Sequence, residues 1–271
     1  MTINSFKKTI WDNYKRQGRS ALPWRHTKDP YAILVSEIML QQTQVARVEK
    51  YYKVFLGQFP DFRSLANASP TDVLIAWQGL GYNRRALFLK RAAEKIVNDF
   101  GGVLPDNREA LESLPGIGNG TSGSLMAFVF NKPEIFIETN IRRVFIYFFF
   151  KGRKKVTDDE LKRYIESTIN IKNVREWYWA LMDYGSAMPD VKKSSNPNRR
   201  SAHYAKQSVF AGSDRELRGK IIRDVLLKKK IATSKLIKEL SISGKRFEKI
   251  VTGLKKEGFL VRNGNYICIN T

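Results

Sequence analysis

LESLPGIGNGTSGSLMAFVF, from Leu111 to Phe130, is the stretch that decides the fold of this chain. A short amphipathic helix is predicted to end at Leu114, because Pro115 cannot continue it, and a second helix begins a few residues later. Gly116 and Gly118 allow the backbone to turn tightly between the two helices. The pattern predicts a helix-hairpin-helix whose outward-facing amides bind a DNA phosphate without reading the base sequence. Taken alone, a Pro-Gly turn between helices also fits a purely structural connection.

The charge balance favours a polyanionic partner. The 271 residues include 48 Lys and Arg against 26 Asp and Glu, which gives a formal net charge of +22. Nucleic acid is the usual partner of such an excess, and a generally basic, soluble surface is the alternative. The sequence contains no apolar run of about 18 residues and no signal-peptide pattern, so we expect no membrane role and a cytoplasmic, nucleoid-associated or otherwise intracellular location.

Cysteine usage limits the possible cofactors. The chain has a single cysteine, Cys268. This excludes an intrachain disulfide and any four-cysteine metal or iron–sulfur site. We therefore expect no metal ion and no iron–sulfur cluster.

Most of the chain is predicted to be helical. Apolar residues recur at helical spacing in ten segments, at 6–16, 31–41, 45–55, 72–77, 84–100, 108–114, 121–130, 141–150, 158–169 and 174–187. No strand-like alternation interrupts them. Residues 1–188 are therefore predicted to form one mainly α domain.

A second, smaller domain is predicted over residues 213–271. Residues 189–212 lose the periodicity and mix Lys and Arg with Ser, Asn and Pro, which is typical of a basic linker. Three short helices then precede two strand-like runs joined by Asn263-Gly264, a strong hairpin signal. This order predicts a winged helix whose third helix presents Lys245 and Arg246 to DNA. A packing or dimerisation module is the alternative.

Glu37 is a candidate general acid. Its helix begins at Asp29-Pro30, a favourable start, and its neighbours Ile33 and Leu40 place its carboxyl on an apolar face. Burial opposes ionisation, and a carboxyl that is still protonated near neutral pH suits a general acid. A structural Glu paired with an arginine fits the same pattern equally well.

Glu138 is the second candidate. It follows the apolar run Ile135 to Ile137 and precedes a predicted helix, where an acid favours the helix dipole, so simple capping also accounts for it. Two acids in one pocket would allow cleavage of a glycosidic bond. One carboxyl would protonate the departing group while the other stabilises the cationic sugar.

Five ordered motifs carry a family resemblance. They are SEIMLQQTQV around Glu37, WQGLGYNRRA from Trp77, LPGIGNGTSGS at the hairpin, IETNIRRV around Glu138 and ALMDYGS from Ala180. Together they resemble the adenine DNA glycosylases of the MutY type, in the helix-hairpin-helix, endonuclease III-like superfamily. The resemblance covers roughly residues 23–185, and FAGSDRELRG at 210–219 is similar to a segment that follows the catalytic region in some members.

The resemblance implies a two-lobed helical fold with the active site in the cleft between the lobes, into which the target nucleotide is flipped. It gives Glu37 the role of protonating adenine, and it gives Gln42 and Tyr82 the role of inserting into the base stack. It further implies DNA contacts for Gln41 and, near the opposing base, Thr43 and Leu80; the residues that it assigns to the base pocket are Arg25, Gly120 and Trp179.

The chain departs from the family at several positions. Glu138 stands where the family usually has an Asp nucleophile, and Gly120 stands where bifunctional relatives carry a Schiff-base lysine, so weak or absent strand cleavage is expected. Trp179 replaces the Gln or Glu that adenine enzymes tend to place against the base edge. The four cluster cysteines are missing. The usual module that reads 8-oxoguanine is absent, and the predicted winged helix takes its place.

Two classes of function follow. The first is a monofunctional DNA glycosylase that acts as a monomer on double-stranded DNA with a mismatched or damaged base, most simply adenine opposite 8-oxoguanine or guanine. Within this class, excision of thymine or uracil opposite guanine is the alternative. The second class is a non-catalytic DNA-binding protein that uses the hairpin and the winged helix. The carboxyls of Glu37 and Glu138 favour the enzyme, because a binding module needs neither.

Overall fold

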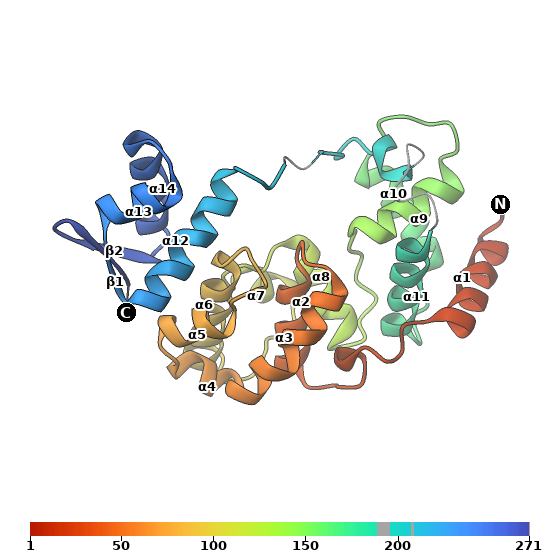
Figure 1. Cartoon of the computed structure of the whole chain (residues 1–271). Coiled ribbons are helices and arrows are strands. Elements are labelled where there is room, and N and C mark those ends of the chain that lie inside the picture. Colours follow the sequence, from red (N-terminus) through yellow and green to blue (C-terminus); the bar gives the residue numbers. More distant parts are fainter. Residues whose placement is uncertain (189–195, 207–208, 271) are drawn as a thin grey trace. The chain divides into compact units, whose positions relative to one another are not determined.

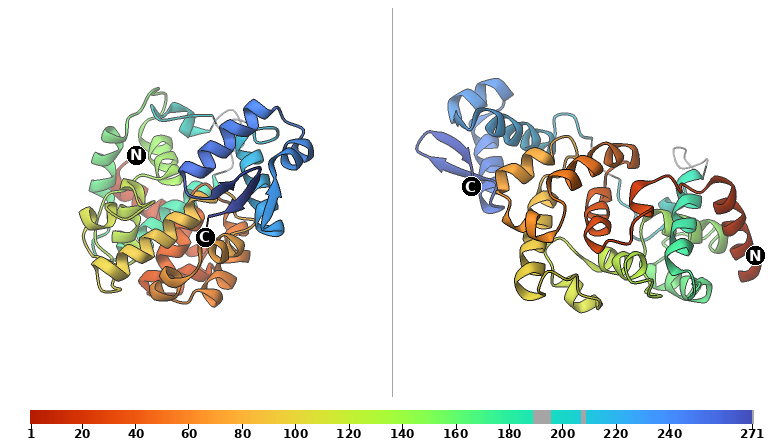
Figure 2. Two further views of the ribbon diagram at one scale, coloured as in Figure 1. Left: turned by 90° about the vertical axis from the view of Figure 1, so that its left-hand side faces the viewer. Right: turned by 90° about the horizontal axis from the view of Figure 1, so that it is seen from below.

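The computed structural model describes residues 1–188, 196–206 and 209–270, and these residues are mainly helical (Figure 1). The chain divides into two compact units, each assembled from segments that are separated in the sequence. Unit 1 contains residues 1–37, 104–113 and 117–206, and unit 2 contains residues 38–103, 114–116 and 207–271. Figure 2 gives two further views of the same elements.

Unit 1 is built around the helix α11. Its helices are α1 (Ile3–Gln17), α7 (Arg108–Glu112), α8 (Asn119–Phe128), α9 (Thr139–Phe149), α10 (Asp158–Thr168) and α11 (Val174–Ala187), with the larger part of α2 (Pro30–Leu40) and the short 3-10 helices η1 (Pro23–Arg25) and η3 (Pro197–Arg200). α11 packs against both α1 and α9. Buried aromatic rings fill the contact, with Phe6 touching Phe145 and Trp177.

Unit 2 contains α3 (Val45–Gln58), α4 (Phe62–Asn67), α5 (Pro70–Ala76) and α6 (Arg84–Asp99), followed by the C-terminal elements. α6 is the central helix of its first part, because α4 and α5 both pack against it. Phe55 and Trp77 are fully buried there and meet edge to face.

The ten expected helices are all present, with ends that differ by a few residues. α4 was not expected, since six residues are too few to establish a helical period. Its capping box, in which the side chains of Asp61 and Ser64 each bond the other residue's backbone, identifies the start of the helix locally.

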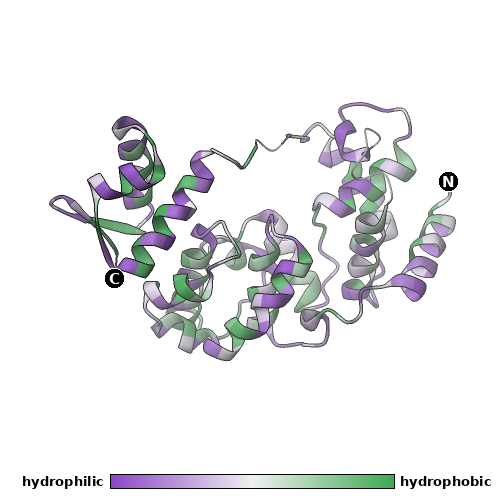
Figure 3. Ribbon diagram, viewed as in Figure 1, coloured by the Kyte–Doolittle hydropathy of each residue, from purple (hydrophilic) through white to green (hydrophobic). Residues whose placement is uncertain are grey.

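The C-terminal elements are α12 (Asp214–Lys228), β1 (Lys230–Ala232), α13 (Thr233–Leu240), α14 (Gly244–Lys256), β2 (Leu260–Asn263) and β3 (Tyr266–Ile269). The three helices and the hairpin were expected, and β1 was not. β1 pairs antiparallel with β3, so the sheet order is β1-β3-β2. In Figure 3, hydrophobic and hydrophilic residues alternate along α12, whose apolar side is buried.

The hairpin turn lies one residue further along than the Asn263-Gly264 prediction. Asn263 pairs with Tyr266, so the two turn residues are Gly264 and Asn265. Gly264 has a φ of 59°, and a glycine at the first central position is what a type II′ turn requires.

Only one of the two glycines in the helix-hairpin-helix turn has to be glycine for steric reasons. Gly116 has a φ of 81°, and an added Cβ would lie 2.8 Å from the Cβ of Phe88, so only glycine fits. Gly118 is different, because its φ of −104° suits any residue and an added Cβ would meet nothing within 4 Å. The steric reason expected for Gly118 is therefore wrong, and open space lies beside it at the start of α8.

Part of the expected basic linker is ordered and packed. Residues 189–195 and 207–208 lie outside the described residues, but residues 196–202 are attached to unit 1. The Asn198 side chain donates to the Thr139 carbonyl, and Arg200 donates to the Phe150 carbonyl at the other end of α9. Ser201 forms a parallel bridge with Val156. The sequence pattern missed this because a segment held by single polar contacts has no hydrophobic period.

Candidate functional site

Glu37 lies on a helix that is buried almost all round. Asp29 accepts hydrogen bonds from the backbone amides of Tyr31 and Ala32 and so starts α2, as expected. From Tyr31 to Met39 every residue of α2 except Glu37 is buried, and Glu37 is half-buried. The helix therefore holds one carboxyl in apolar surroundings.

Burial raises the pKa of Glu37 from 4.5 to about 7. The hydroxyl of Ser124 donates a 2.6 Å hydrogen bond to its carboxylate and opposes this rise, while the negative charge of Glu138 adds to it. In the described part of the chain no arginine or lysine pairs with Glu37. The alternative prediction, that Glu37 forms a structural ion pair with an arginine, is therefore wrong for the described residues.

Glu138 is the N-cap residue of α9, as the capping interpretation required. Its carboxylate accepts from the backbone amide of Ile141 at 2.7 Å and from the side-chain amide of Asn140 at 3.1 Å. Burial raises the pKa of Glu138, and these donors together with the positive charge of Arg143 limit the rise. The carboxyl of Glu138 therefore does two things: it caps α9, and its charge raises the pKa of Glu37.

The two carboxyls differ in what stabilises their charged forms. Glu138 receives two hydrogen bonds and faces a helix start, whereas Glu37 receives one hydroxyl bond. Glu138 is thus the better site for the first negative charge, and that charge then opposes ionisation of Glu37. The arrangement suits one protonated and one ionised carboxyl near neutral pH.

Arg25 and Trp179 of the expected base pocket lie together in unit 1. The guanidinium of Arg25 sits 5.1 Å from the ring centroid of Trp179. Asp183 fixes Arg25 through a bidentate pair at 2.7 and 2.8 Å and also accepts from the backbone and side chain of Arg19. Burial by itself would raise the pKa of Asp183, but the hydrogen bonds and positive charges of Arg25 and Arg19 together outweigh it, so the pKa is lowered.

Gly120, the third pocket residue, lies one turn before Ser124 on α8 and therefore shares its helix face. An added Cβ at Gly120 would meet nothing within 4 Å. The position is open beside the helix face that bonds Glu37.

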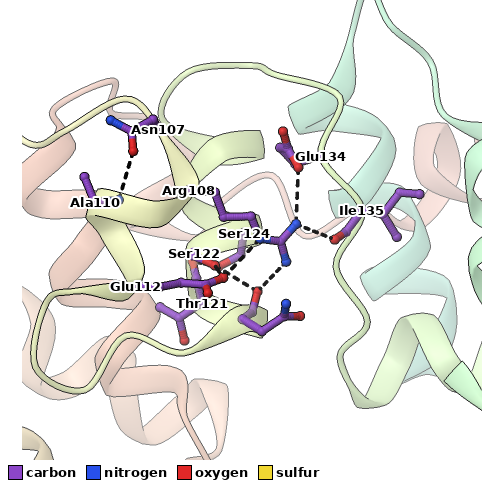
Figure 4. A network of polar contacts seen from close by, with 10 residues as sticks. Asn107, Arg108, Ala110, Glu112, Thr121, Ser122, Ser124, Glu134 and Ile135 are labelled. Carbon is purple, nitrogen blue, oxygen red and sulfur yellow. Dashed lines mark hydrogen bonds and ion pairs between the residues drawn. The ribbon is translucent and has the colours of Figure 1, made fainter. Parts of the chain in front are cut away.

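Arg108 braces the elements around this site (Figure 4). Its guanidinium donates to the Asn119 carbonyl in the first turn of α8, to the Glu134 carboxylate and to the Ile135 carbonyl, at 2.9 to 3.2 Å. It also pairs with Glu112 of α7. One side chain thus joins α7, the start of α8 and the segment that leads to Glu138.

The expected DNA-contact residues of the first domain belong to unit 2, except Gly118, which belongs to unit 1. Gln42 and Tyr82 are exposed, and both adopt the left-handed conformation, with φ of 55° and 48°. Gln41 and Thr43 flank Gln42 and are half-buried. Leu80 is only 1% exposed, so in this conformation its side chain is not available to a DNA strand. Its burial is the structure's correction to the expected contact.

Lys245 and Arg246 of α14 have different surroundings. Lys245 is exposed. Arg246 bonds the Asp214 carboxylate at 2.8 to 2.9 Å and the Gly212 carbonyl at 2.7 Å, so it holds the start of α12. The side chain of Arg246 is nevertheless 40% exposed, so its expected DNA contact stays a prediction.

Sequence reasoning missed several residues that shape the site. Their signals were available in the motifs: Ser124 follows Gly120 by one helical turn, and Asp183 is the acid of ALMDYGS. Asn140 and Arg143 follow Glu138 in IETNIRRV. The motif letters did not reveal which distant partner each would meet.

The residues present do not fit an iron–sulfur cluster. A cluster of the implied kind needs four cysteine thiolates, and the only cysteine of the chain, Cys268, lies in β3. Within residues 1–188, 196–206 and 209–270, no group of three or more His, Cys, Asp or Glu is arranged to hold a metal ion. No helix among these residues is long and apolar enough to cross a membrane.

Comparisons with known proteins agree with this architecture. Residues 35–170 match the HhH-GPD superfamily of base excision DNA repair proteins. An adenine DNA glycosylase of Buchnera aphidicola subsp. Baizongia pistaciae is 37% identical over 198 residues, covering 73% of this chain and 56% of the relative. The chain thus spans about half the length of the Buchnera adenine DNA glycosylases that it matches.

Relatives named thymine/uracil-DNA glycosylases match over more of their own length. A thymine/uracil-DNA glycosylase of Pyrobaculum aerophilum is 33% identical over 193 residues, covering 69% of this chain and 84% of the relative. A solved thermostable thymine-DNA glycosylase superposes with a TM-score of 0.64 at 28% identity, covering 70% of this chain and 89% of that one. A DNA complex of endonuclease III has a TM-score of 0.60 at 17% identity, covering 71% of this chain and 90% of that one, and shows the shared fold.

Proposed function

Because this chain belongs to the HhH-GPD superfamily of base excision DNA repair proteins, we propose that it is a monofunctional DNA glycosylase that hydrolyses the N-glycosidic bond of a mispaired base in double-stranded DNA. The observation that carries the proposal is the coupled pair Glu37 and Glu138. Both carboxyls lie in buried surroundings, and only Glu138 is held by a helix start.

The two carboxyls divide the reaction between them. Protonated Glu37 gives its proton to a ring nitrogen of the base as the glycosidic bond breaks, so the base leaves as a neutral molecule. Ionised Glu138 stabilises the cationic sugar that remains. Water then adds to the anomeric carbon and loses a proton, which restores the protonated Glu37. Gly120 offers no amine, so the strand stays intact.

We propose adenine, opposite 8-oxoguanine or guanine, as the base removed. Adenine is a poor leaving group unless a ring nitrogen is protonated, and the pKa of Glu37 near 7 keeps a proton available at physiological pH. Thymine or uracil opposite guanine is the second candidate. It is supported by the longer coverage of the thymine/uracil relatives and by Trp179, which offers stacking where adenine enzymes place a hydrogen-bonding side chain.

A panel of end-labelled duplexes tests the function. Each duplex carries A opposite 8-oxoguanine, A opposite G, T opposite G or U opposite G, and alkali reveals abasic sites. We expect product on the adenine duplexes, and none with Glu37→Gln. Product only on the T or U duplexes would establish the second candidate. DNA binding without product on any duplex would support the non-catalytic DNA-binding protein.

Three further proposals accompany this function. The C-terminal elements form a winged helix that contacts DNA phosphates, the protein acts as a monomer, and it works in the cytoplasm on the nucleoid. The net charge of +22 supports the DNA contact. Light scattering of the free protein and of its DNA complex tests the oligomeric state, and a mass of two chains in either would contradict the monomer.

A further inference from the structure

Arg85, at the start of α6, is a buried cation that binds backbone carbonyls. It is 8% exposed, and its two terminal nitrogens donate to the carbonyls of Ile38, Met39, Gln41, Leu80 and Gly81 and to the hydroxyl of Thr43, at 2.6 to 3.4 Å. Burial lowers its pKa to about 10, so it stays charged near neutral pH. The ion pairs of the described residues do not include Arg85. Its partners are therefore neutral oxygens: main-chain carbonyls at the end of α2, and main-chain and hydroxyl oxygens of the two loops that follow α2 and α5.

Two of these acceptors, the carbonyls of Gln41 and Gly81, each lie directly before an exposed residue. Gln41 immediately precedes Gln42, and Gly81 immediately precedes Tyr82. A bond to a carbonyl orients the peptide plane that it belongs to, and φ of the following residue is the rotation about the N–Cα bond that leaves this plane. Arg85 thus orients the peptide plane before each of two left-handed residues, Gln42 with φ 55° and Tyr82 with φ 48°.

The left-handed conformation is costly for residues with a side chain. Such residues persist only where the surroundings enforce them. Arg85 contributes to such surroundings for both Gln42 and Tyr82, because it bonds the carbonyl that precedes each of them. Its guanidinium also lies 5.5 Å from the ring centroid of Tyr82 and 5.4 Å from that of Trp77.

We propose that Arg85 is the positioning residue that holds Gln42 and Tyr82 ready to enter the base stack, so that its contribution is to flipping of the target base and not to bond cleavage. The inference rests on the proposed function. The acceptors that bond Arg85 all belong to unit 2, and the two loops that it joins carry the exposed residues expected to open the duplex.

The test separates flipping from chemistry by using two substrates. One duplex holds the target base in a mismatch, and the other holds it in an unpaired bubble that needs no flipping. Arg85→Lys keeps the charge but loses the planar fork that reaches both loops. We expect single-turnover excision from the mismatch to fall by about tenfold to a hundredfold and excision from the bubble to stay within about threefold of the wild type.

The matched control is Arg84→Lys, at the exposed neighbouring position, which should change neither rate. Thermal unfolding monitors whether Arg85→Lys folds. If it does not, Arg85→Gln, whose shorter planar amide cannot reach both loops, should show the same selective loss. Equal losses on both substrates, or no loss on either, would overturn the inference. A wild-type protein that excises from neither substrate would instead contradict the proposed function.

Discussion

The Ser124 hydroxyl lies 2.6 Å from the Glu37 carboxylate, and this contact joins α8 to α2 across 87 positions of sequence. The bond favours the charged form of Glu37 and so limits the rise that burial causes, which leaves the pKa of Glu37 at about 7. Without it, Glu37 would keep its proton to a higher pH.

Ser124→Ala should therefore shift the alkaline limb of the curve of excision rate against pH to higher pH. In the wild type we expect the single-turnover rate to fall as the pH rises through about 7, because Glu37 loses its proton there. In the variant the same fall should occur at a higher pH. A limb that stays in place, or moves to lower pH, would show that Glu37 does not control the profile.

Glu37→Gln should change how stability depends on pH. The folded protein holds a proton on Glu37 up to about pH 7, whereas the unfolded chain releases it near 4.5, so wild-type stability falls as the pH rises between these values. This difference corresponds to at most about 3 kcal/mol. Urea unfolding at pH 5 and pH 8 should show that the variant gains stability relative to wild type at the higher pH. If the free energies of unfolding of variant and wild type differ by the same amount at both pH values, the raised pKa assigned to Glu37 is wrong.

Glu138→Gln and Glu37→Gln should each reduce single-turnover excision by about a hundredfold or more, with little change in DNA affinity, because each removes transition-state stabilisation. Glu138→Asp should retain part of the activity, since Asp also caps a helix and keeps the charge. Gel-shift titration measures the affinity. If both Gln variants excise the base at the wild-type rate, the two-carboxylate mechanism is wrong.

Gly120→Lys should add strand cleavage to base excision. The open space beside Gly120 accommodates the longer side chain, on the helix face that also carries Ser124, and an amine there can attack the sugar. Borohydride should trap a covalent adduct with the variant and not with the wild type. Gly118→Lys, at a second open glycine near the same helix start, is the control and should give no adduct. Adduct formation by the wild type would contradict the monofunctional assignment.

Lys245→Ala and Arg246→Ala should have different effects. Lys245 is exposed, so its loss should weaken DNA binding and reduce the slope of affinity against salt concentration by about one. Arg246 bonds Asp214 and the Gly212 carbonyl, so its loss should lower thermal stability. Titrations at several salt concentrations and a melting curve measure the two effects. A reduced salt slope with unchanged stability for Arg246→Ala would support its expected DNA contact.

Sequence by itself determined the described α-helices other than α4, the helix-hairpin-helix turn and the candidate carboxyls. Pro115 and Gly116 specify a turn through constraints within a few residues, and the apolar neighbours of Glu37 lie one turn away on the same helix. Such features depend on local geometry, which the order of residues contains. The capping role of Glu138 was predictable for the same reason, because its acceptor bond to Ile141 spans three residues.

Tertiary structure alone decided which distant groups meet. Periodicity identifies a buried helix face but not the partner that covers it, so the bond from Ser124 to Glu37 and the clamp of Asp183 on Arg25 were not predictable. Arg85 is the clearest case, because its acceptors are main-chain carbonyls, which every residue possesses. Only the path of the chain determines which carbonyls converge on one guanidinium, and that path depends on how all the helices of a unit pack together.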